Sequence, residues 1–306
     1  MEHYIISKLS CFEQIFKLDR LFMSQFIFRG HSDADWILKT SFTRTKEDFS
    51  IPIVIGYYNR EEFEMIDEFQ RKYHLFSQFP RPKSNDYFGW LAIMQHYGAP
   101  TRLLDFSESL FVALYFAAID VKAPWDGTQD RKYAIYCINQ DKLNSIISQR
   151  LSIKKQFINE SMDMSHIKLA NEFIEGGKKG ENIPSMVIPL KPKIYTERLS
   201  RQQGLFLMPT NLQYSFENNL LSSFQEQEKL DFIRIEFDEL ISHSRCYMDT
   251  VSKGENEDIN VLKIVIDFPA SEVLSYLIQM NITAETLFPG LEGLSKSLIQ
   301  KHIIPL

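Results

Sequence analysis

The sequence predicts a single α+β domain spanning residues 1–306, and three patterns indicate this fold class. Helical periodicity dominates the chain up to about residue 120, whereas strand-like runs dominate the remainder. These runs lie far apart in sequence, so they must pair over long separations, as the strands of α+β proteins do. No internal repeat, low-complexity segment or clear linker divides the chain.

The elements of the first 80 residues are expected from hydrophobic spacing. Phe12, Ile15 and Phe16 would give a short helix one apolar face. Aromatic and β-branched residues that lead into Arg29 and Gly30 indicate a strand. The expected elements are a helix at 9–17, a strand at 25–30, extended pieces at 36–38 and 42–44, and an amphipathic helix at 60–79.

The rest of the chain is organised around residues 90–118, which predict a helix, a sharp break, a polar elbow and a second helix. Gly98 and Pro100 end the first helix. The run from Leu110 to Ile119 is apolar on every face, so the second helix must be buried. The polar side chains between the helices must be satisfied by one another, by backbone or by a ligand. They are Gln95, His96, Thr101, Arg102, Asp105 and Ser107.

Beyond the second helix, turn-forming residues separate runs of alternating or continuous apolar character. The segment 152–182 is polar and contains three glycines, so short helices and a mobile surface loop are expected there. The other expected elements are strands at 133–138, 185–190, 205–209, 230–237 and 261–268, a polar turn at 198–203, and helices at 142–151, 272–280 and 291–302.

Composition and charge are those of an ordinary globular protein. The net charge of −6 and the isoelectric point near 5.7 argue against a generally basic surface that tracks nucleic-acid phosphates. The three cysteines form no C-x-x-C pair, which favours a reducing cytoplasm. The N-terminus does not resemble a secretion signal, and the longest apolar run is roughly half a membrane span. A soluble cytoplasmic protein without membrane contact is expected.

Several common catalytic signatures are missing from the sequence. It contains no G-x-x-x-x-G-K-[ST], G-x-G-x-x-G, H-E-x-x-H or G-x-S-x-G motif. The seven histidines show no metal-ligand spacing, so no metal site is expected. These absences lower the odds of a P-loop enzyme, a Rossmann dehydrogenase, a zinc hydrolase or an α/β-hydrolase.

Arg29 is the first candidate binding residue. An arginine near the end of an apolar strand is costly to bury without an anionic partner. Its planar guanidinium suits a phosphate or carboxylate held by two hydrogen bonds. An internal salt bridge, for example with Asp105, is the alternative. Gly30 would let a ligand or neighbouring backbone approach closely, or would simply form a turn.

The elbow supplies further candidates. Asp105 and Ser107 precede the buried helix and are natural helix caps. The same geometry would point free backbone N–H groups, and the positive end of the helix dipole, at a ligand. With Arg29 and Arg102 nearby, this would form a pyrophosphate site. His96 is either a structural histidine or a functional group.

The motifs that contain these residues resemble the FRG domain family, which is named for its F-R-G motif. Most of the chain takes part in the resemblance, and the Q-H-Y-G-x-P-T-R-L-L-D signature is long and specific. The family is found in bacteria and their phages. The matching segments are 28–30, 95–107, 113–117, Arg201-x-Gln203-Gly204-x-Phe206 and 288–291.

A weaker resemblance links the same segments to arginine-type ADP-ribosyltransferases. It implies a split antiparallel sheet with flanking helices, NAD as substrate, and a protein or nucleic-acid acceptor. By this similarity Arg29 would hold the NAD phosphates and Ser107 would brace the nicotinamide half. The implied NAD-binding residues are Arg29, Gly30, His31, Thr101, Arg102, Asp105 and Ser107, and the implied catalytic residues are Gln203, Arg29 and His96.

Gln203 departs from the transferase pattern because it stands where the catalytic glutamate is expected. That glutamate binds a ribose hydroxyl and stabilises an oxocarbenium-like state by charge, which a neutral amide supplies only in part. Three interpretations follow: slow chemistry by a different constellation, a carboxylate such as Glu197 or Glu292 in its place, or binding without turnover.

Two hypotheses therefore remain, with a third disfavoured. The first is an NAD-binding protein that transfers ADP-ribose to a macromolecule, in a defence or toxin role. The second is a non-catalytic binding module in which Arg29, Arg102 and Asp105 form a buried structural network. A nuclease or nucleic-acid binder is disfavoured by the acidic balance and the lack of carboxylate clusters for metal. If the first is correct, Arg29, His96, Arg102, Ser107 and Gln203 should line one cleft.

Overall fold

The computed structural model describes residues 4–22, 25–50, 58–77, 81–121, 132–153, 162–224, 233–234, 236–238, 240 and 260–302. Its strands are β1 (Tyr4–Leu9), β2 (Phe26–His31), β3 (Leu104–Ser107), β4 (Tyr133–Asn139), β5 (Val187–Leu190), β6 (Gly204–Pro209), β7 (Ile233–Arg234) and β8 (Val261–Ile266). They form one sheet in the order β5-β6-β3-β2-β4-β8-β1-β7.

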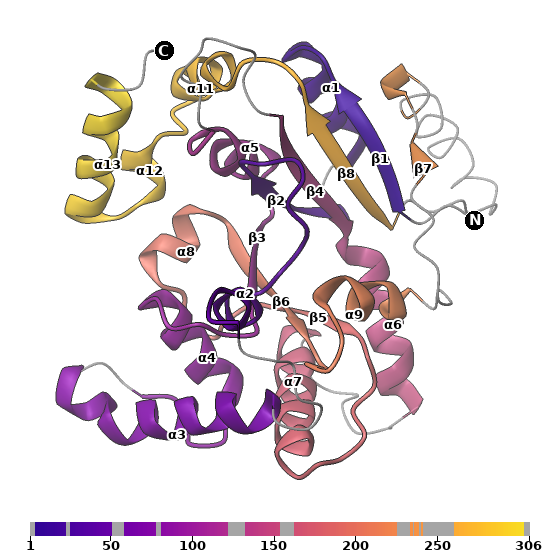
Figure 1. Cartoon of the computed structure of the whole chain (residues 1–306), viewed down its shortest axis with the longest axis vertical. Coiled ribbons are helices and arrows are strands. Elements are labelled where there is room, and N and C mark those ends of the chain that lie inside the picture. Colours follow the sequence, from indigo (N-terminus) through magenta and orange to yellow (C-terminus); the bar gives the residue numbers. More distant parts are fainter. Residues whose placement is uncertain are drawn as a thin grey trace.

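The helices of the described residues cover this sheet and extend beyond its edges (Figure 1). They are α1 (Glu13–Phe22), α2 (Ser41–Asp48), α3 (Tyr58–Phe76), α4 (Tyr87–His96), α5 (Leu110–Ala118), α6 (Gln140–Ile153), α7 (Met162–Lys178), α8 (Glu197–Arg201), α9 (Phe216–Ser223), α11 (Ala270–Gln279), α12 (Ala284–Leu287) and α13 (Gly290–His302). The mixed content confirms the α+β class.

Strand alternation distributes the sheet between separate cores. In β4, Ile135 and Cys137 pack with α1, α5 and α11, whereas Tyr136 and Ile138 face the opposite side with α6 and α9. In β6, Phe206 and Met208 join a third core formed with α3, α4 and α7. The α5 group and the α3–α4–α7 group therefore occupy different ends of the sheet (Figure 1).

The sheet is almost interrupted between β2 and β3. These strands pair antiparallel at a single position, Phe28 opposite Ser107. Beyond this pair β2 continues along β4 through six residues, and β3 continues along β6 through four. The sheet is mixed rather than antiparallel throughout, because β1 pairs in parallel with both β7 and β8.

The expected division into a helical part before residue 120 and a strand-rich part after it is corrected by the structure. Strands β1 to β3 come from the first part, and seven of the described helices, α6 to α9 and α11 to α13, come from the second. One sheet takes strands from both parts, which is how long sequence separations are closed.

Several segments differ from their expected secondary structure. The extended piece expected at 42–44 lies in α2, where the Thr40 side chain accepts a hydrogen bond from the Thr43 amide and caps the helix. The segment expected to hold short helices and a loop contains the 17-residue α7, because Ile167, Ala170 and Ile174 form a buried face. Strand β1 and helix α9 were not expected. Most of the strand expected at 230–237 lies outside the described residues.

Strands β4, β5, β6 and β8 and helices α3, α6, α11 and α13 confirm the corresponding expectations to within a few residues. Among the helices that the structure describes, none has the length and apolar character needed to cross a membrane.

Candidate functional site

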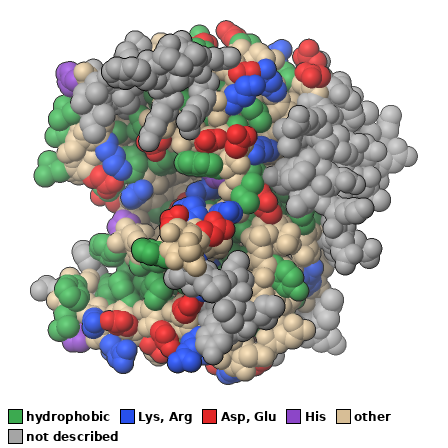
Figure 2. Space-filling view, in the orientation of Figure 1, with side chains coloured by type: hydrophobic (Ala, Val, Ile, Leu, Met, Phe, Trp, Pro, Cys, Tyr) green, Lys and Arg blue, Asp and Glu red, His purple; other side chains and the backbone are tan. Residues whose placement is uncertain are grey.

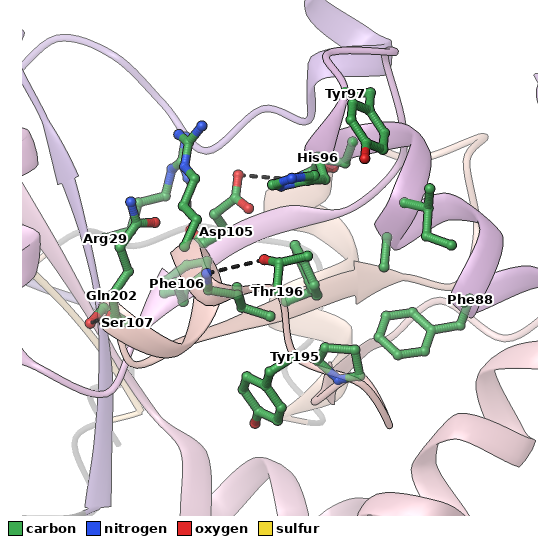
Figure 3. A pocket seen from close by; sticks show the side chains of 18 of the residues that line it. Arg29, Phe88, His96, Tyr97, Asp105, Phe106, Ser107, Tyr195, Thr196 and Gln202 are labelled. Carbon is green, nitrogen blue, oxygen red and sulfur yellow. Dashed lines mark hydrogen bonds between the residues drawn. The ribbon is translucent and has the colours of Figure 1, made fainter. Parts of the chain in front are cut away.

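A cleft of about 2000 Å³ opens where β2 and β3 diverge. Its walls come from these two strands, from α4, α5 and α7, and from residues 192–199 with Gln202. Figure 2 shows the hollow between the two groups of helices, with charged side chains along it. Figure 3 shows side chains from β2, β3, α4 and the segment 195–202 around the same space.

Arg29 lies at the divergence of the two strands. Its Nη1 donates to the main-chain carbonyl of Asp105 at 2.7 Å, and its Nε donates to Nε2 of His31 at 3.1 Å. The Asp105 carbonyl has no partner in β2, so the guanidinium takes the place of a missing ladder hydrogen bond. Arg29 therefore bridges the gap in the sheet.

Arg29 has capacity left for a ligand. Its Nη2 makes no hydrogen bond within the described chain, and no carboxylate lies within ion-pair distance of it there. Burial lowers the pKa of Arg29 to about 10; the Asp105 carboxylate opposes this shift and Arg44 adds to it. The group stays charged at neutral pH, and its charge is not neutralised by an ion pair.

His31 orients Arg29. Only 6% of His31 is exposed. Burial first, and then the Arg29 charge, lower the pKa of His31 to about 3, so the imidazole is neutral at physiological pH. Because Arg29 Nε can only donate, Nε2 of His31 must carry the lone pair and Nδ1 the proton. The ring also contacts the rings of Trp36 and Tyr136.

Gly30 has a packing role. A Cβ at this position would lie 2.0 Å from the carbonyl oxygen of Ala113 and 2.5 Å from the amide nitrogen of Ala117. No side chain fits between β2 and the backbone of α5. The F-R-G glycine and the two alanines of α5 are thus explained together: they bring the strand and the helix into close contact.

The signature between α4 and β3 forms one hydrogen-bonded chain. The Thr101 hydroxyl, which is buried, donates to Oε1 of Gln95. Nε2 of Gln95 in turn donates to Oδ2 of Asp105 at 2.8 Å. Thr101 Oγ1 also accepts from the Leu103 amide at 3.2 Å, which fixes the hydroxyl. Asp105 is exposed and lines the cleft, and one of its two carboxylate oxygens is bound by Gln95.

Arg102 does not line the cleft, which corrects the expectation that it binds a phosphate. It is 1% exposed and ion-pairs with Glu62, which is 0% exposed. Nε donates to both Glu62 oxygens at 3.0 and 2.7 Å, and Nη1 donates to the Thr210 carbonyl at 3.3 Å. Glu62 was not expected as a partner, although its position four residues before Ile66 places it on the buried face of α3.

Ser107 and Gln202 join the cleft to the following turn. The Ser107 hydroxyl donates to the main-chain carbonyl of Gln202 at 2.8 Å and accepts from the Ser109 amide at 3.0 Å. Ser107 lines the cleft, but its hydroxyl is engaged by the protein. It positions the α8–β6 turn and the start of α5. The residue that caps α5 is Ser109, whose side chain accepts from Val112.

His96 lies at the end of α4 and lines the cleft (Figure 3). Its side chain is exposed, and its described contact is with the Tyr97 ring at 5.0 Å. Partial burial and the nearby Arg198 lower the pKa of His96, whereas Glu292 raises it. The imidazole is therefore available as a neutral proton acceptor at the rim.

Gln203 is not among the residues that line the cleft, although its neighbour Gln202 is. Its side chain is exposed, and its backbone takes the left-handed conformation with φ of 47°. Its carbonyl accepts from the Glu108 amide at 2.9 Å. The left-handed turn that joins α8 to β6 points Gln202 at the cleft and sets Gln203 beside it. The structure therefore does not bring Gln203 into the cleft with Arg29.

The segment that carries Gln203 binds the C-terminal helices. Arg201 Nη1 donates to the Glu285 carbonyl at 3.2 Å, and Gln202 Nε2 donates to the Leu287 carbonyl at 3.2 Å. The Arg198 guanidinium lies 4.8 Å from the centre of the Phe288 ring. The later pair of matching segments, 201–206 and 288–291, therefore meet in space.

Three aromatic side chains around the cleft were not predicted from the sequence as site residues. Trp36, Tyr97 and Tyr195 line it and are exposed. Their signal in the sequence was weak, because single aromatics in loops and at helix ends show no periodicity. Among the side chains that the structure describes, no group of three or more His, Cys, Asp or Glu could hold a metal ion.

Comparison with known proteins returned one finding. Residues 24–124 match the family model of the FRG domain. Searches of curated proteins and of solved structures returned no match. The matched range contains Arg29, Gly30, the Thr101–Gln95–Asp105 chain, the Arg102 anchor and α5. Residues 24–124 of the chain are therefore an FRG domain.

Proposed function

We propose that the cleft binds NAD through Arg29 and that the protein transfers ADP-ribose to a protein or nucleic-acid acceptor. The observation that carries this proposal is the state of Arg29. It is a partly buried, charged guanidinium with one free terminal nitrogen and no carboxylate partner among the described residues. Such a group suits the pyrophosphate of a dinucleotide.

The charges around Arg29 support an anionic ligand. Arg44 lines the same part of the cleft and raises the local positive potential, as its effect on the pKa of Arg29 indicates. Arg198 and Lys168 also line the cleft. The cleft lining as a whole carries both acidic and basic side chains, and the protein has a net charge of −6, so the positive charge at Arg29 and Arg44 favours a small anion held locally over a long nucleic-acid duplex.

The size and the aromatic lining of the cleft support a dinucleotide. Ligand pockets commonly measure about 300–1,000 Å³. This cleft measures about 2000 Å³, which leaves room for NAD and for part of an acceptor. Trp36 on one side and Tyr195 on the other offer exposed ring faces on which adenine or nicotinamide could stack.

The arrangement of the sheet supports the transferase comparison. The resemblance to arginine-type ADP-ribosyltransferases implies a split sheet, and here β2 and β3 share one residue pair beside Arg29. The proposed fold is therefore ADP-ribosyltransferase-like in its β2–β3 region. The parallel pairing of β1 with β7 and β8 lies at the opposite edge of the sheet.

The rival hypothesis is a non-catalytic module in which the Arg29 network is structural. The bonds from Arg29 to His31 and to the Asp105 carbonyl favour it, because both are internal. It predicts that Arg29→Ala lowers the melting temperature and that NAD has no effect on stability. The NAD hypothesis predicts that NAD stabilises the wild type and not the variant.

The test measures NAD binding by calorimetry and nicotinamide release with time for the wild type, Arg29→Ala and Arg60→Ala. Arg60 is a matched control, since it is an exposed arginine paired with Glu64 on α3 and does not line the cleft. We expect binding and release by the wild type and Arg60→Ala, and weaker binding by Arg29→Ala. A wild-type protein that neither binds NAD nor releases nicotinamide contradicts the proposal.

A further inference from the structure

We infer that Asp105 is the catalytic carboxylate of this site and that it binds the hydroxyls of the nicotinamide ribose. This inference rests on the proposed NAD site and adds the group that the Gln203 substitution leaves unassigned. The observation behind it is the Thr101–Gln95–Asp105 chain, which fixes one oxygen of a carboxylate that lines the cleft and leaves the other without a hydrogen bond to the described residues.

The hydrogen-bonded chain has the form of a positioning device. Thr101 is 0% exposed, and its hydroxyl is held by the Leu103 amide. Gln95 has its amide oriented by Thr101, so its NH₂ group must point at Asp105. Oδ2 of Asp105 is thereby occupied at 2.8 Å. Its Oδ1 makes no hydrogen bond with the residues that the structure describes.

The main chain of Asp105 is also fixed, because Arg29 donates to its carbonyl oxygen. Asp105 pairs with Phe206 of β6, which packs among the buried side chains of the α3–α4–α7 core. The residue is therefore held by its strand, by Arg29 and by Gln95. A group held at three points needs little reorganisation when charge develops beside it.

Three acidic side chains near this site are engaged by other residues. Glu197 binds Arg201 at 2.6 Å. Glu292 binds Lys296 at 2.8 Å and lies 3.7 Å from Arg198. Asp86 is the cap of α4 and accepts from the Gly89 amide. Asp105 is also the acidic residue whose charge acts on Arg29, so the carboxylate and the proposed phosphate-binding group are neighbours.

The proposed step cleaves the nicotinamide–ribose bond of NAD. The bond between C1′ of the ribose and the nicotinamide nitrogen breaks, and its electron pair leaves with nicotinamide, which becomes neutral. Positive charge develops at C1′ and the ring oxygen, and a carboxylate hydrogen-bonded to the ribose 2′-hydroxyl stabilises it. A nucleophilic atom of the acceptor forms the new bond to C1′ and loses its proton to solvent or to a base such as His96.

This assignment explains why a glutamine is tolerated at position 203. Position 203 lies outside the cleft lining, so a glutamine there removes no charge from the cleft. The Q-H-Y-G-x-P-T-R-L-L-D signature then has two tasks. Its Gln, Thr and Asp hold a charge in the cleft, and its Arg anchors the segment to Glu62.

The test compares the wild type with Asp105→Asn, Glu197→Gln and Glu272→Gln. Asparagine keeps the shape of Asp105 and removes its charge, and Glu272 is an exposed control on α11, outside the cleft. Two quantities are measured for each protein: the Kd for NAD and for an NAD analogue without the 2′-hydroxyl on the nicotinamide ribose, and the single-turnover rate of nicotinamide release. Melting curves confirm that each variant is folded.

We expect Asp105→Asn to slow nicotinamide release by about a hundredfold or more. We expect the wild type to bind NAD about tenfold more tightly than the deoxy analogue, and Asp105→Asn to bind the two almost equally. Thr101→Val, which removes the hydroxyl at the start of the chain, should give a smaller loss of rate with the same direction. If Asp105→Asn does not fold, Thr101→Val provides the same comparison.

Three outcomes would overturn the inference, and they differ from one another. Normal release by Asp105→Asn together with loss by Glu197→Gln transfers the role to Glu197. If the wild type and Asp105→Asn prefer NAD over the deoxy analogue by the same Kd ratio, Asp105 does not bind the 2′-hydroxyl, although the NAD site itself remains supported. Failure of the wild type to bind NAD at all overturns the proposed function, and this inference with it.

Discussion

Two arginines of the FRG signature occupy contrasting surroundings. Arg102 is 1% exposed, binds Glu62 through its Nε and Nη2 nitrogens and does not line the cleft. Arg29 is partly buried, lines the cleft, and binds one carbonyl and one imidazole. Its Nη2 makes no hydrogen bond within the described residues. Both arginines lie in or beside apolar strands, and the sequence pattern predicted a phosphate-binding role for both. Their partners decide what each can do.

The comparison distinguishes a buried positive charge that stabilises the fold from one that is available to bind an anionic ligand. A carboxylate that is itself buried neutralises Arg102, so removing either partner leaves an uncompensated charge in the core. Arg29 interacts with neutral acceptors, which orient it but do not neutralise it. A phosphate would add the missing negative charge. The following predictions test the contrast, beginning with the largest expected effect.

Replacement of Arg102 by Ala should destabilise the fold by about 3–5 kcal/mol, because Glu62 is left charged and buried. Glu62→Gln should act in the same direction. Urea unfolding measures both. The double variant Arg102→Met with Glu62→Leu should recover most of the loss, since apolar residues can replace a buried pair. A loss below about 1 kcal/mol for Arg102→Ala would contradict a structural role.

Replacement of Gly30 by Ala should destabilise the fold by about 1–3 kcal/mol, because the new Cβ overlaps the backbone of α5. It should also weaken NAD binding, since β2 carries Arg29 and would be displaced. Thermal unfolding and calorimetry report the two effects. A variant with unchanged stability would show that the strand and the helix are not in close contact.

Replacement of Arg29 by Ala should cost less stability than Arg102→Ala but weaken NAD binding by about tenfold to a hundredfold. Arg29→Lys should retain part of the binding, because it keeps the charge and loses the planar fork. We expect the loss of NAD binding by Arg29→Ala to be larger than its loss of stability would explain. If Arg29→Ala unfolds as readily as Arg102→Ala, the two arginines share one structural role and the contrast is lost.

The smallest expected effect concerns His31 and pH. Its pKa is about 3 in the folded protein, against about 6.5 in an unfolded chain. The unfolded state therefore binds a proton between these values while the folded state does not, so stability falls as the pH is lowered through this window. His31→Gln should show a shallower decline between pH 6 and about pH 4 in unfolding experiments. Parallel curves for the two proteins would contradict this origin.

The elements with strong periodicity could be predicted from the sequence, and those that depend on distant partners could not. The buried helix at α5 and strand β4 have continuous apolar runs that leave few alternatives. Helix α2 has weak local preference, and its start is set by the Thr40 cap and by Thr101, whose carbonyl accepts from the Phe42 amide. Such a contact between residues 59 positions apart leaves no local pattern.

The same division applies to the site. Local motif chemistry was enough to identify Arg29, Asp105 and Ser107 as cleft residues. It could not separate Arg29 from Arg102, because the difference lies in Glu62, which is 40 positions away in sequence. Nor could it place Gln203, since a left-handed turn of one residue decides which of two adjacent glutamines faces the cleft.

A crystal structure of the protein with ADP-ribose tests the central claim most directly. The account predicts pyrophosphate oxygens about 2.7–3.0 Å from Arg29 Nη2 and a ribose hydroxyl within hydrogen-bonding distance of Asp105 Oδ1. It also predicts that Arg102 keeps its bond to Glu62 and does not approach the ligand. ADP-ribose bound away from Arg29, or an Arg29 that turns to the Asp105 carboxylate and leaves the phosphates without contact, would contradict it.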